Sequence, residues 1–75
     1  MVKAIILVRS PKKLIAARLL KIDRVYESFP VSGQFDAVAL INVKSFNEIK
    51  KVTTNIQHIS GVERTETMVE IEEKV

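Results

Sequence analysis

The segment Val31–Val43, with the sequence VSGQFDAVALINV, decides the fold of this 75-residue chain. Successive side chains of a β-strand point to opposite faces, and from Phe35 onward this segment is apolar on both, interrupted only by Asp36 and Asn42. A strand whose two faces both avoid water belongs in the middle of a sheet. Because glycine readily adopts a positive φ, we expect Gly33 at the first central position of a two-residue hairpin loop.

The first third of the chain predicts a second central strand followed by a helix. The strand is Val2–Val8, which is rich in Ile and Val and apolar on both faces apart from Lys3. Ser10 can cap the helix and Pro11 fits its first position, where no amide donor is missed. The apolar residues then recur at helical spacing and predict one buried stripe: Ile15, Leu19 and Ile22, with Ala16 and Leu20 beside it.

Two more polar segments are predicted to be edge strands. Arg24–Ser32 contains Pro30, which cannot donate a hydrogen bond to a neighbouring strand and therefore indicates a sheet edge or a bulge. In a regular strand, Val25 and Phe29 of this segment share one face. Val62–Glu72 alternates threonine and aliphatic residues with charged residues and Met68, which also indicates an edge strand with one wet face.

A second helix is predicted to begin at Ser45. Ser45 and Glu48 have the spacing of a capping box, in which each side chain bonds the backbone amide of the other residue. Its apolar stripe consists of Ile49, Val52, Ile56 and Ile59, and Ser60-Gly61 is expected to end the helix.

The predicted fold is a single α+β domain, residues 1–75, with the ferredoxin-like order βαββαβ. Right-handed connections place both helices on one face of a four-stranded antiparallel sheet. The central strands are apolar on both faces, so the uncovered face would be the kind of apolar patch that monomers seldom expose. The chain has no cysteine and one histidine, so no disulfide or zinc site is available as a staple. We therefore predict a homodimer formed through the open sheet face.

The residue types that carry catalysis are few, and a structural role accounts for most of them. His58 lies near the end of the second predicted helix, without a second histidine or any cysteine to join it. Capping accounts for the serines at the predicted helix ends, Ser10, Ser45 and Ser60. Charge on an edge strand discourages edge pairing, which accounts for Glu66, Glu70, Glu72 and Glu73. We predict no enzymatic activity, no metal site and no cofactor.

Two other function classes are disfavoured by composition. The only glycines, Gly33 and Gly61, lie too far apart to form a glycine-rich phosphate loop. RNA-recognition modules of this topology need stacking aromatic residues on the middle strands, and these strands offer Ile, Leu, Val and Ala instead.

The charge distribution is uneven along the chain. Residues 1–25 hold seven basic residues against one acidic residue, and the remainder is net acidic. A basic first helix is compatible with nucleic acid or an acidic partner, but we favour a solvated helix face because no stacking aromatics accompany the charge. The lack of cysteine and of any signal sequence or membrane segment predicts a soluble cytoplasmic protein.

Three segments together resemble the effector-binding domain of the Lrp/AsnC (leucine-responsive regulator, or feast/famine) family. They are VSGQFDAVALINV, the capped helix after it, and ISGVERTETMVEI, which begins at Ile59. The resemblance covers essentially the whole chain. Its most specific parts are Gly33–Asp36 (GQFD), similar to the family's Gly-x-Tyr/Phe-Asp turn, and Gly61–Thr67 (GVERTET).

The resemblance implies a dimer through the sheets, assembly of dimers into an octamer or similar ring, and a small-molecule effector bound between dimers, commonly an amino acid. It implies a ligand site that includes Gly33, Gln34, Asp36, Ser45, Thr65 and Thr67. Ser45 departs from the family pattern, in which an acidic residue often stands at this position. Amides at a glycine turn can bind a carboxylate, threonine hydroxyls can bond either end of an amino acid, and a carboxylate can hold an ammonium group.

Family regulators carry an N-terminal helix-turn-helix domain, whereas this sequence begins at the first strand. We therefore expect a stand-alone form without direct sequence-specific DNA binding. The alternative hypothesis is a ligand-free assembly module that co-assembles with full-length Lrp/AsnC regulators.

Overall fold

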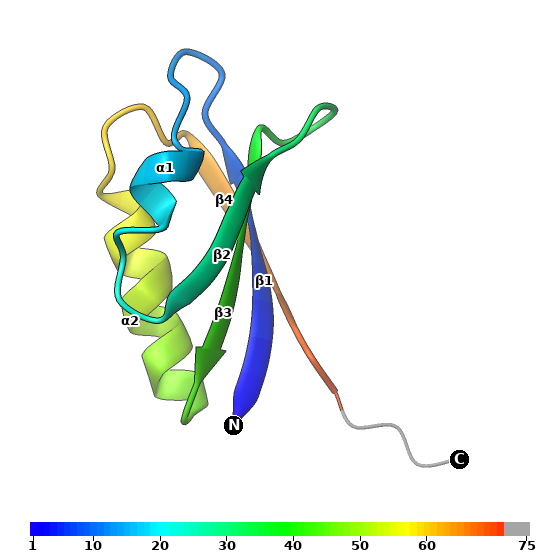
Figure 1. The fold of residues 1–75 in the computed structure, drawn as a ribbon, viewed down its shortest axis with the longest axis vertical. Helices are drawn as coiled ribbons and strands as arrows, with labels where there is room; N and C mark the ends of the chain where they lie inside the picture. Colours follow the sequence, from blue (N-terminus) through cyan, green and yellow to red (C-terminus); the bar gives the residue numbers. More distant parts are fainter. Residues whose placement is uncertain (72–75) are drawn as a thin grey trace.

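The sheet has four antiparallel strands in the spatial order β2-β3-β1-β4, in a computed structural model that describes residues 1–71. Both helices cover one face of this sheet (Figure 1). The elements are β1 (Val2–Arg9), α1 (Ala16–Leu19), β2 (Val25–Pro30), β3 (Ala37–Val43), α2 (Phe46–Gln57) and β4 (Arg64–Val69). The predicted ferredoxin-like fold is confirmed, with β1 and β3 central and β2 and β4 at the edges. The part of the predicted last strand at Glu72 lies outside the described residues.

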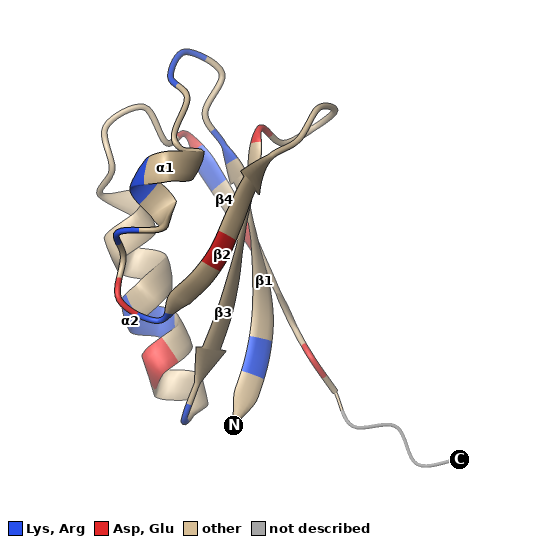
Figure 2. Ribbon diagram, in the orientation of Figure 1, with Lys and Arg blue, Asp and Glu red and all other residues tan. Residues whose placement is uncertain are grey.

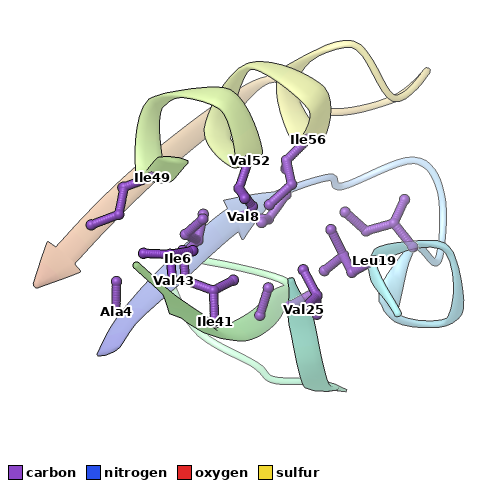
Figure 3. Packing of buried hydrophobic residues seen from close by; sticks show 13 residues of the cluster. Ala4, Ile6, Val8, Leu19, Val25, Ile41, Val43, Ile49, Val52 and Ile56 are labelled. Carbon is purple, nitrogen blue, oxygen red and sulfur yellow. The ribbon is translucent and has the colours of Figure 1, made fainter. Parts of the chain in front are cut away.

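The core lies between the sheet and the helices (Figure 3). Every second residue of the central strands points into it, and α2 contributes the apolar stripe that the sequence predicts. The side chains that are 0 % exposed are Ile6, Val8, Leu19, Ala39, Ile41 and Ile56. Strand alternation thus places the same residues inside that the sequence pattern places there.

Helix α1 does not begin at Ser10 and Pro11 as predicted. It spans only Ala16–Leu19, and no side chain caps its start at Ile15. Ser10 has other partners, because its hydroxyl donates to the Lys13 carbonyl at 2.8 Å and its amide donates to the Asp36 carboxylate at 2.8 Å. Residues 10–15 therefore form a turn and loop instead of a first helical turn. The predicted buried stripe of Ile15 and Leu19 is nevertheless correct.

Helix α2 begins directly after Ser45 as predicted, but the predicted capping box is wrong. The Ser45 side chain makes no capping hydrogen bond. The Glu48 carboxylate turns instead to Arg24 and lies 3.2 Å from its Nε atom. A charged partner supplied by the α1–β2 connection outcompetes the local amide, because a charge-assisted contact is the stronger interaction.

Strand β2 contains a bulge that changes which side chains share a face. Val25 pairs with Ile41 and Glu27 pairs with Leu40, so Tyr26 is the extra residue. Val25 faces the core, whereas Phe29, opposite Val38, falls on the open face of the sheet. The prediction that Val25 and Phe29 share a face is therefore wrong, while the edge position indicated by Pro30 is confirmed.

The hairpin between β2 and β3 is longer than predicted. The Val31 amide donates to the Asp36 carbonyl at 3.0 Å, which encloses four residues, 32–35, instead of two. Gly33 has the expected positive φ, +120°. The longer loop arises because the Asp36 amide leaves the hairpin and donates to the Val8 carbonyl of β1 at 2.8 Å.

The sheet face opposite the helices is apolar and uncovered in the single protomer. Ile5 and Met68, which face each other across β1 and β4, are 38 % and 48 % exposed. Phe29 and Tyr26 of β2 are 40 % and 56 % exposed. A shallow depression of about 430 Å³ on this face is lined by Ile5, Tyr26, Leu40 and Met68 among others. We call this surface the open face.

Candidate functional site

A cavity of about 430 Å³ lies between the β1–α1 connection and the β2–β3 hairpin. Its polar lining comes from Ser10, Lys12, Lys13 and Asp36. Its apolar walls are Pro11, Leu14, Ile15, Ala16, Ala17, Pro30 and Val31. This volume is within the range of about 300–1,000 Å³ that small-molecule sites occupy. We call this space the hairpin cavity.

Asp36 is the acidic group of the hairpin cavity and is held in place by its neighbours. Its Oδ2 atom accepts the Ser10 amide at 2.8 Å and lies 3.5 Å from Nη1 of Arg9. The side chain is 33 % exposed, so it is reachable from solvent. The structure gives no hydrogen bond from residues 1–71 to the other carboxylate oxygen, Oδ1. Asp36 is therefore a fixed carboxylate with an oxygen that can accept a further donor.

Lys13 fixes the wall of the hairpin cavity to the second half of the chain. Its Nζ atom donates to the Ser60 hydroxyl at 2.9 Å. Its aliphatic stem lies against Gly61, where an added Cβ would come within 3.0 Å of the Lys13 side chain. Gly61 also has a φ of +100°. Glycine at this position therefore lets the β1–α1 connection and the α2–β4 connection approach closely.

Five of the six predicted ligand residues lie toward the hairpin end of the sheet. Gly33 and Gln34 are exposed in the hairpin loop, and Asp36 follows them. Thr65 pairs with Val8, the residue whose carbonyl accepts the Asp36 amide. Asp36 and Thr65 therefore flank β1 at the same level, about 10 Å apart at two strand spacings.

Thr65 and Thr67 point toward the helix-covered side of the sheet and are half-buried. They pair with Val8 and Ile6, whose side chains are in the core. The Thr65 hydroxyl accepts a hydrogen bond from Nε2 of Gln57 at 3.1 Å. Neither threonine lines the hairpin cavity.

Ser45 is not brought near the other five residues in one protomer. It follows the far end of β3, whose seven residues separate it from the hairpin. At about 3.3 Å per residue this is a distance of about 20 Å along the sheet. Figure 1 shows the hairpin and the start of α2 at opposite ends of the molecule.

Sequence reasoning did not find Ser10 and Lys12 as lining residues of the hairpin cavity. Both fall in a segment that the sequence predicts to be the start of a helix. The available signal was Pro11, because a proline is as compatible with a turn as with a first helical position. Among residues 1–71 no group of three His, Cys, Asp or Glu is arranged to hold a metal ion. No described helix is both long and apolar enough to cross a membrane.

The chain belongs to the Lrp/AsnC ligand binding domain family, which it matches over residues 3–75. The family resemblance predicted from the sequence is thereby confirmed. The family is one of ligand-binding domains, which confirms the prediction of no enzymatic activity. Among proteins of curated function, none matches the sequence.

Solved structures of similar proteins share the fold over nearly the whole chain. TTHA0845 from Thermus thermophilus has a TM-score of 0.89 and 30 % identity, covering 100 % of this chain and 99 % of its own. The hypothetical protein PHS023 from Pyrococcus horikoshii has a TM-score of 0.82 and 25 % identity, covering 97 % and 93 %. The leucine response regulatory protein LrpA of Mycobacterium tuberculosis, at 21 % identity, shares the fold with a TM-score of 0.80, and the match covers 96 % of this chain and 51 % of LrpA.

Proposed function

We propose that this domain binds a free amino acid at contacts between dimers and thereby contributes to the regulation of transcription. The observation that carries the proposal is the position of Asp36, a fixed carboxylate at the wall of a cavity of ligand size. Membership of a ligand-binding family whose similar structures include regulators supports the same function.

The hairpin cavity has the complementary charges that a zwitterion needs. The free oxygen of Asp36 can accept an amino acid's ammonium group, and Lys12, which forms no ion pair with a described carboxylate, can hold the carboxylate group. The apolar walls suit an aliphatic side chain better than a charged one. Gly33 and Gln34 lie at the exposed tip of the same hairpin, where a neighbouring dimer can reach them.

Dimerisation through the open face is the second part of the proposal. Half-exposed Ile5, Phe29 and Met68 on one continuous sheet surface favour a second copy of the chain as its cover. A ligand site shared between such dimers would couple binding to assembly, because ligand that binds only the assembled form stabilises it. A ring of dimers is also the arrangement that can bring Ser45 and Thr67 of one protomer near the hairpin of another.

The proposal is tested by a thermal-shift screen of the twenty amino acids, repeated on Asp36→Asn and Thr67→Val. Ligand at about 100 times its dissociation constant contributes about 2.7 kcal/mol of stability, a shift of roughly 10–20 °C for a domain of this size. For each protein we compare the melting temperature with ligand minus the melting temperature without ligand, so any loss of stability in a variant cancels. Lys50→Gln, on the exposed side of α2, is the control with an altered charge away from both the hairpin cavity and the open face.

Selective shifts that Asp36→Asn abolishes and Lys50→Gln preserves would support the amino-acid function. Shifts untouched by both site variants would mean that binding occurs elsewhere on the protein. If no amino acid shifts the melting temperature, the domain acts as a ligand-free assembly module, which a pull-down of full-length Lrp/AsnC regulators then tests.

A further inference from the structure

Positive charge is concentrated on the helical side of the molecule. Among residues 1–71 the helices and their connections hold eight lysines and arginines against three carboxylates. The remaining described residues, on the strands, their ends and the hairpin, hold three basic residues against four acidic ones. Figure 2 shows basic segments in the connection after β1, in α1 and the turn after it, and in the first half of α2, where an acidic segment lies beside the basic one.

Most of this positive charge has no acidic partner in the part of the chain that the structure describes. Of the three carboxylates on the helical side, Asp23 and Glu48 both lie against Arg24, at 3.9 and 3.2 Å. Arg24 is the only helical-side cation in an ion pair with a described carboxylate. The others are exposed and form no ion pair within residues 1–71: Lys12, Lys13, Arg18, Lys21, Lys44, Lys50 and Lys51.

The outward face of α2 carries a cluster of four hydrogen-bonding side chains. Lys50, Lys51, Thr54 and Asn55 line one shallow depression of about 360 Å³ on this helix. Residues four apart on a helix lie on the same face, so Lys50 stands above Thr54 and Lys51 above Asn55. Lysine, threonine and asparagine side chains are the groups that contact phosphate oxygens in nucleic-acid complexes.

We propose that the helical layer, centred on the outward face of α2, binds the phosphate backbone of duplex nucleic acid without reading its sequence. A protein partner would need buried aromatic or arginine anchors, and a membrane surface would need apolar groups to insert. The depression on α2 is lined by two lysines, a threonine and an asparagine, which favours phosphate groups over either of these partners. The large apolar side chains that are exposed on the helical side, Leu14, Leu20 and Phe46, lie outside this depression. The helical layer faces solvent in the single protomer, so the inference does not depend on the dimer or on the amino-acid ligand.

The test is fluorescence anisotropy with labelled 20-base-pair duplexes of DNA and of RNA, each in two unrelated sequences, across a salt series. Counterion release predicts that log K falls linearly with log salt, with a slope of about −0.9 for each phosphate contacted. Lys50→Gln/Lys51→Gln should reduce the magnitude of the slope by about 1.8 and weaken binding at low salt about tenfold or more. Comparison of the two duplex types identifies which of them is the stronger ligand.

The matched control is Ser32→Glu/Gln34→Glu, which lowers the net charge by the same two units at exposed residues of the β2–β3 hairpin. Circular dichroism and sedimentation confirm that both variants keep the fold and oligomeric state of the wild type. The inference holds if the α2 variant loses affinity, the control keeps it and both sequences of one duplex type bind equally. It is overturned if neither duplex binds at low salt, or if both variants weaken binding equally.

Discussion

Replacing two apolar residues of the open face by lysine should separate the dimer without unfolding the protomer. Ile5 and Met68 face each other across β1 and β4, and they are 38 % and 48 % exposed in the single protomer. A lysine at either position can lay its stem on the sheet and keep its ammonium group in water. The same lysine in the dimer would have to bury that charge.

The magnitude follows from the area that the protomer leaves exposed. Complete burial of a large aliphatic side chain contributes about 1.5–3 kcal/mol, so a side chain still half-exposed has about 1 kcal/mol left to gain. Both residues occur in each protomer of a symmetric dimer, which gives a loss of about 4 kcal/mol for Ile5→Lys/Met68→Lys. This is about a thousandfold increase in the dissociation constant, and the desolvation of the lysines increases it further.

The assay is sedimentation velocity at low micromolar concentration, with circular dichroism to confirm that the protomer is folded. Leu20→Lys is the matched control, because Leu20 is 50 % exposed but lies beside α1 on the helical side. We expect a dimer for the wild type and the control, and a monomer for the double variant. A double variant that sediments as a dimer, or a wild type that is a stable monomer, would refute the reasoning.

Three further predictions concern stability and are measured as changes in the free energy of unfolding by urea denaturation. Gly61→Ala should destabilise the protein by more than Gly33→Ala. Both glycines have a positive φ, but only at Gly61 would the added Cβ lie 3.0 Å from the Lys13 side chain. Equal losses of stability would contradict a role for this Lys13 contact. Ile6→Ala should cost about 2–5 kcal/mol because this side chain is 0 % exposed, and a cost below about 1 kcal/mol would contradict its place in the core. Asn42→Val should raise the free energy of unfolding by about 1 kcal/mol, because the buried Asn42 Oδ1 accepts no hydrogen bond from residues 1–71. A lower free energy of unfolding would contradict this reasoning.

The arrangement of the sheet was predictable from the sequence because burial is a property of whole strands. The two-sided apolarity of Val2–Val8 and of Val31–Val43 determines which strands are central, whatever their exact ends. Pro30 indicates in the same way that β2 is an edge strand, because it cannot donate a hydrogen bond to a neighbouring strand. Such patterns repeat over many residues, so a local irregularity does not cancel them.

Features that depend on a distant partner were not predictable. The Ser10 amide binds the carboxylate of Asp36, and Glu48 pairs with Arg24, so long-range contacts replaced the expected local caps. The bulge at Tyr26 likewise depends on how β2 meets β3. In each case a polar group has one possible partner nearby in the sequence and another far away in it. Sequence reasoning identifies only the nearby partner.

The candidate site was predictable to the extent that it rests on the hairpin. Gly33 and Asp36 follow from a turn motif, and the structure places Asp36 at the wall of the hairpin cavity. The opposite wall, which includes Lys12, was not predicted, because the sequence pattern of its residues indicates a helix whereas they form a loop. A cavity between two connections of the chain is a tertiary feature, and one connection alone does not predict it.

The bulge and Pro30 in β2 also affect how the protein behaves when it is concentrated. A flat free edge offers unpaired N–H and C=O groups to a strand of another molecule, which is how domain swapping and amyloid growth begin. Pro30 has no N–H to offer, and the bulge twists this edge away from a straight template. The other edge, β4, presents the charged residues Arg64 and Glu66. Growth of the sheet strand by strand, from one molecule to the next, is therefore disfavoured even when the protein is crowded.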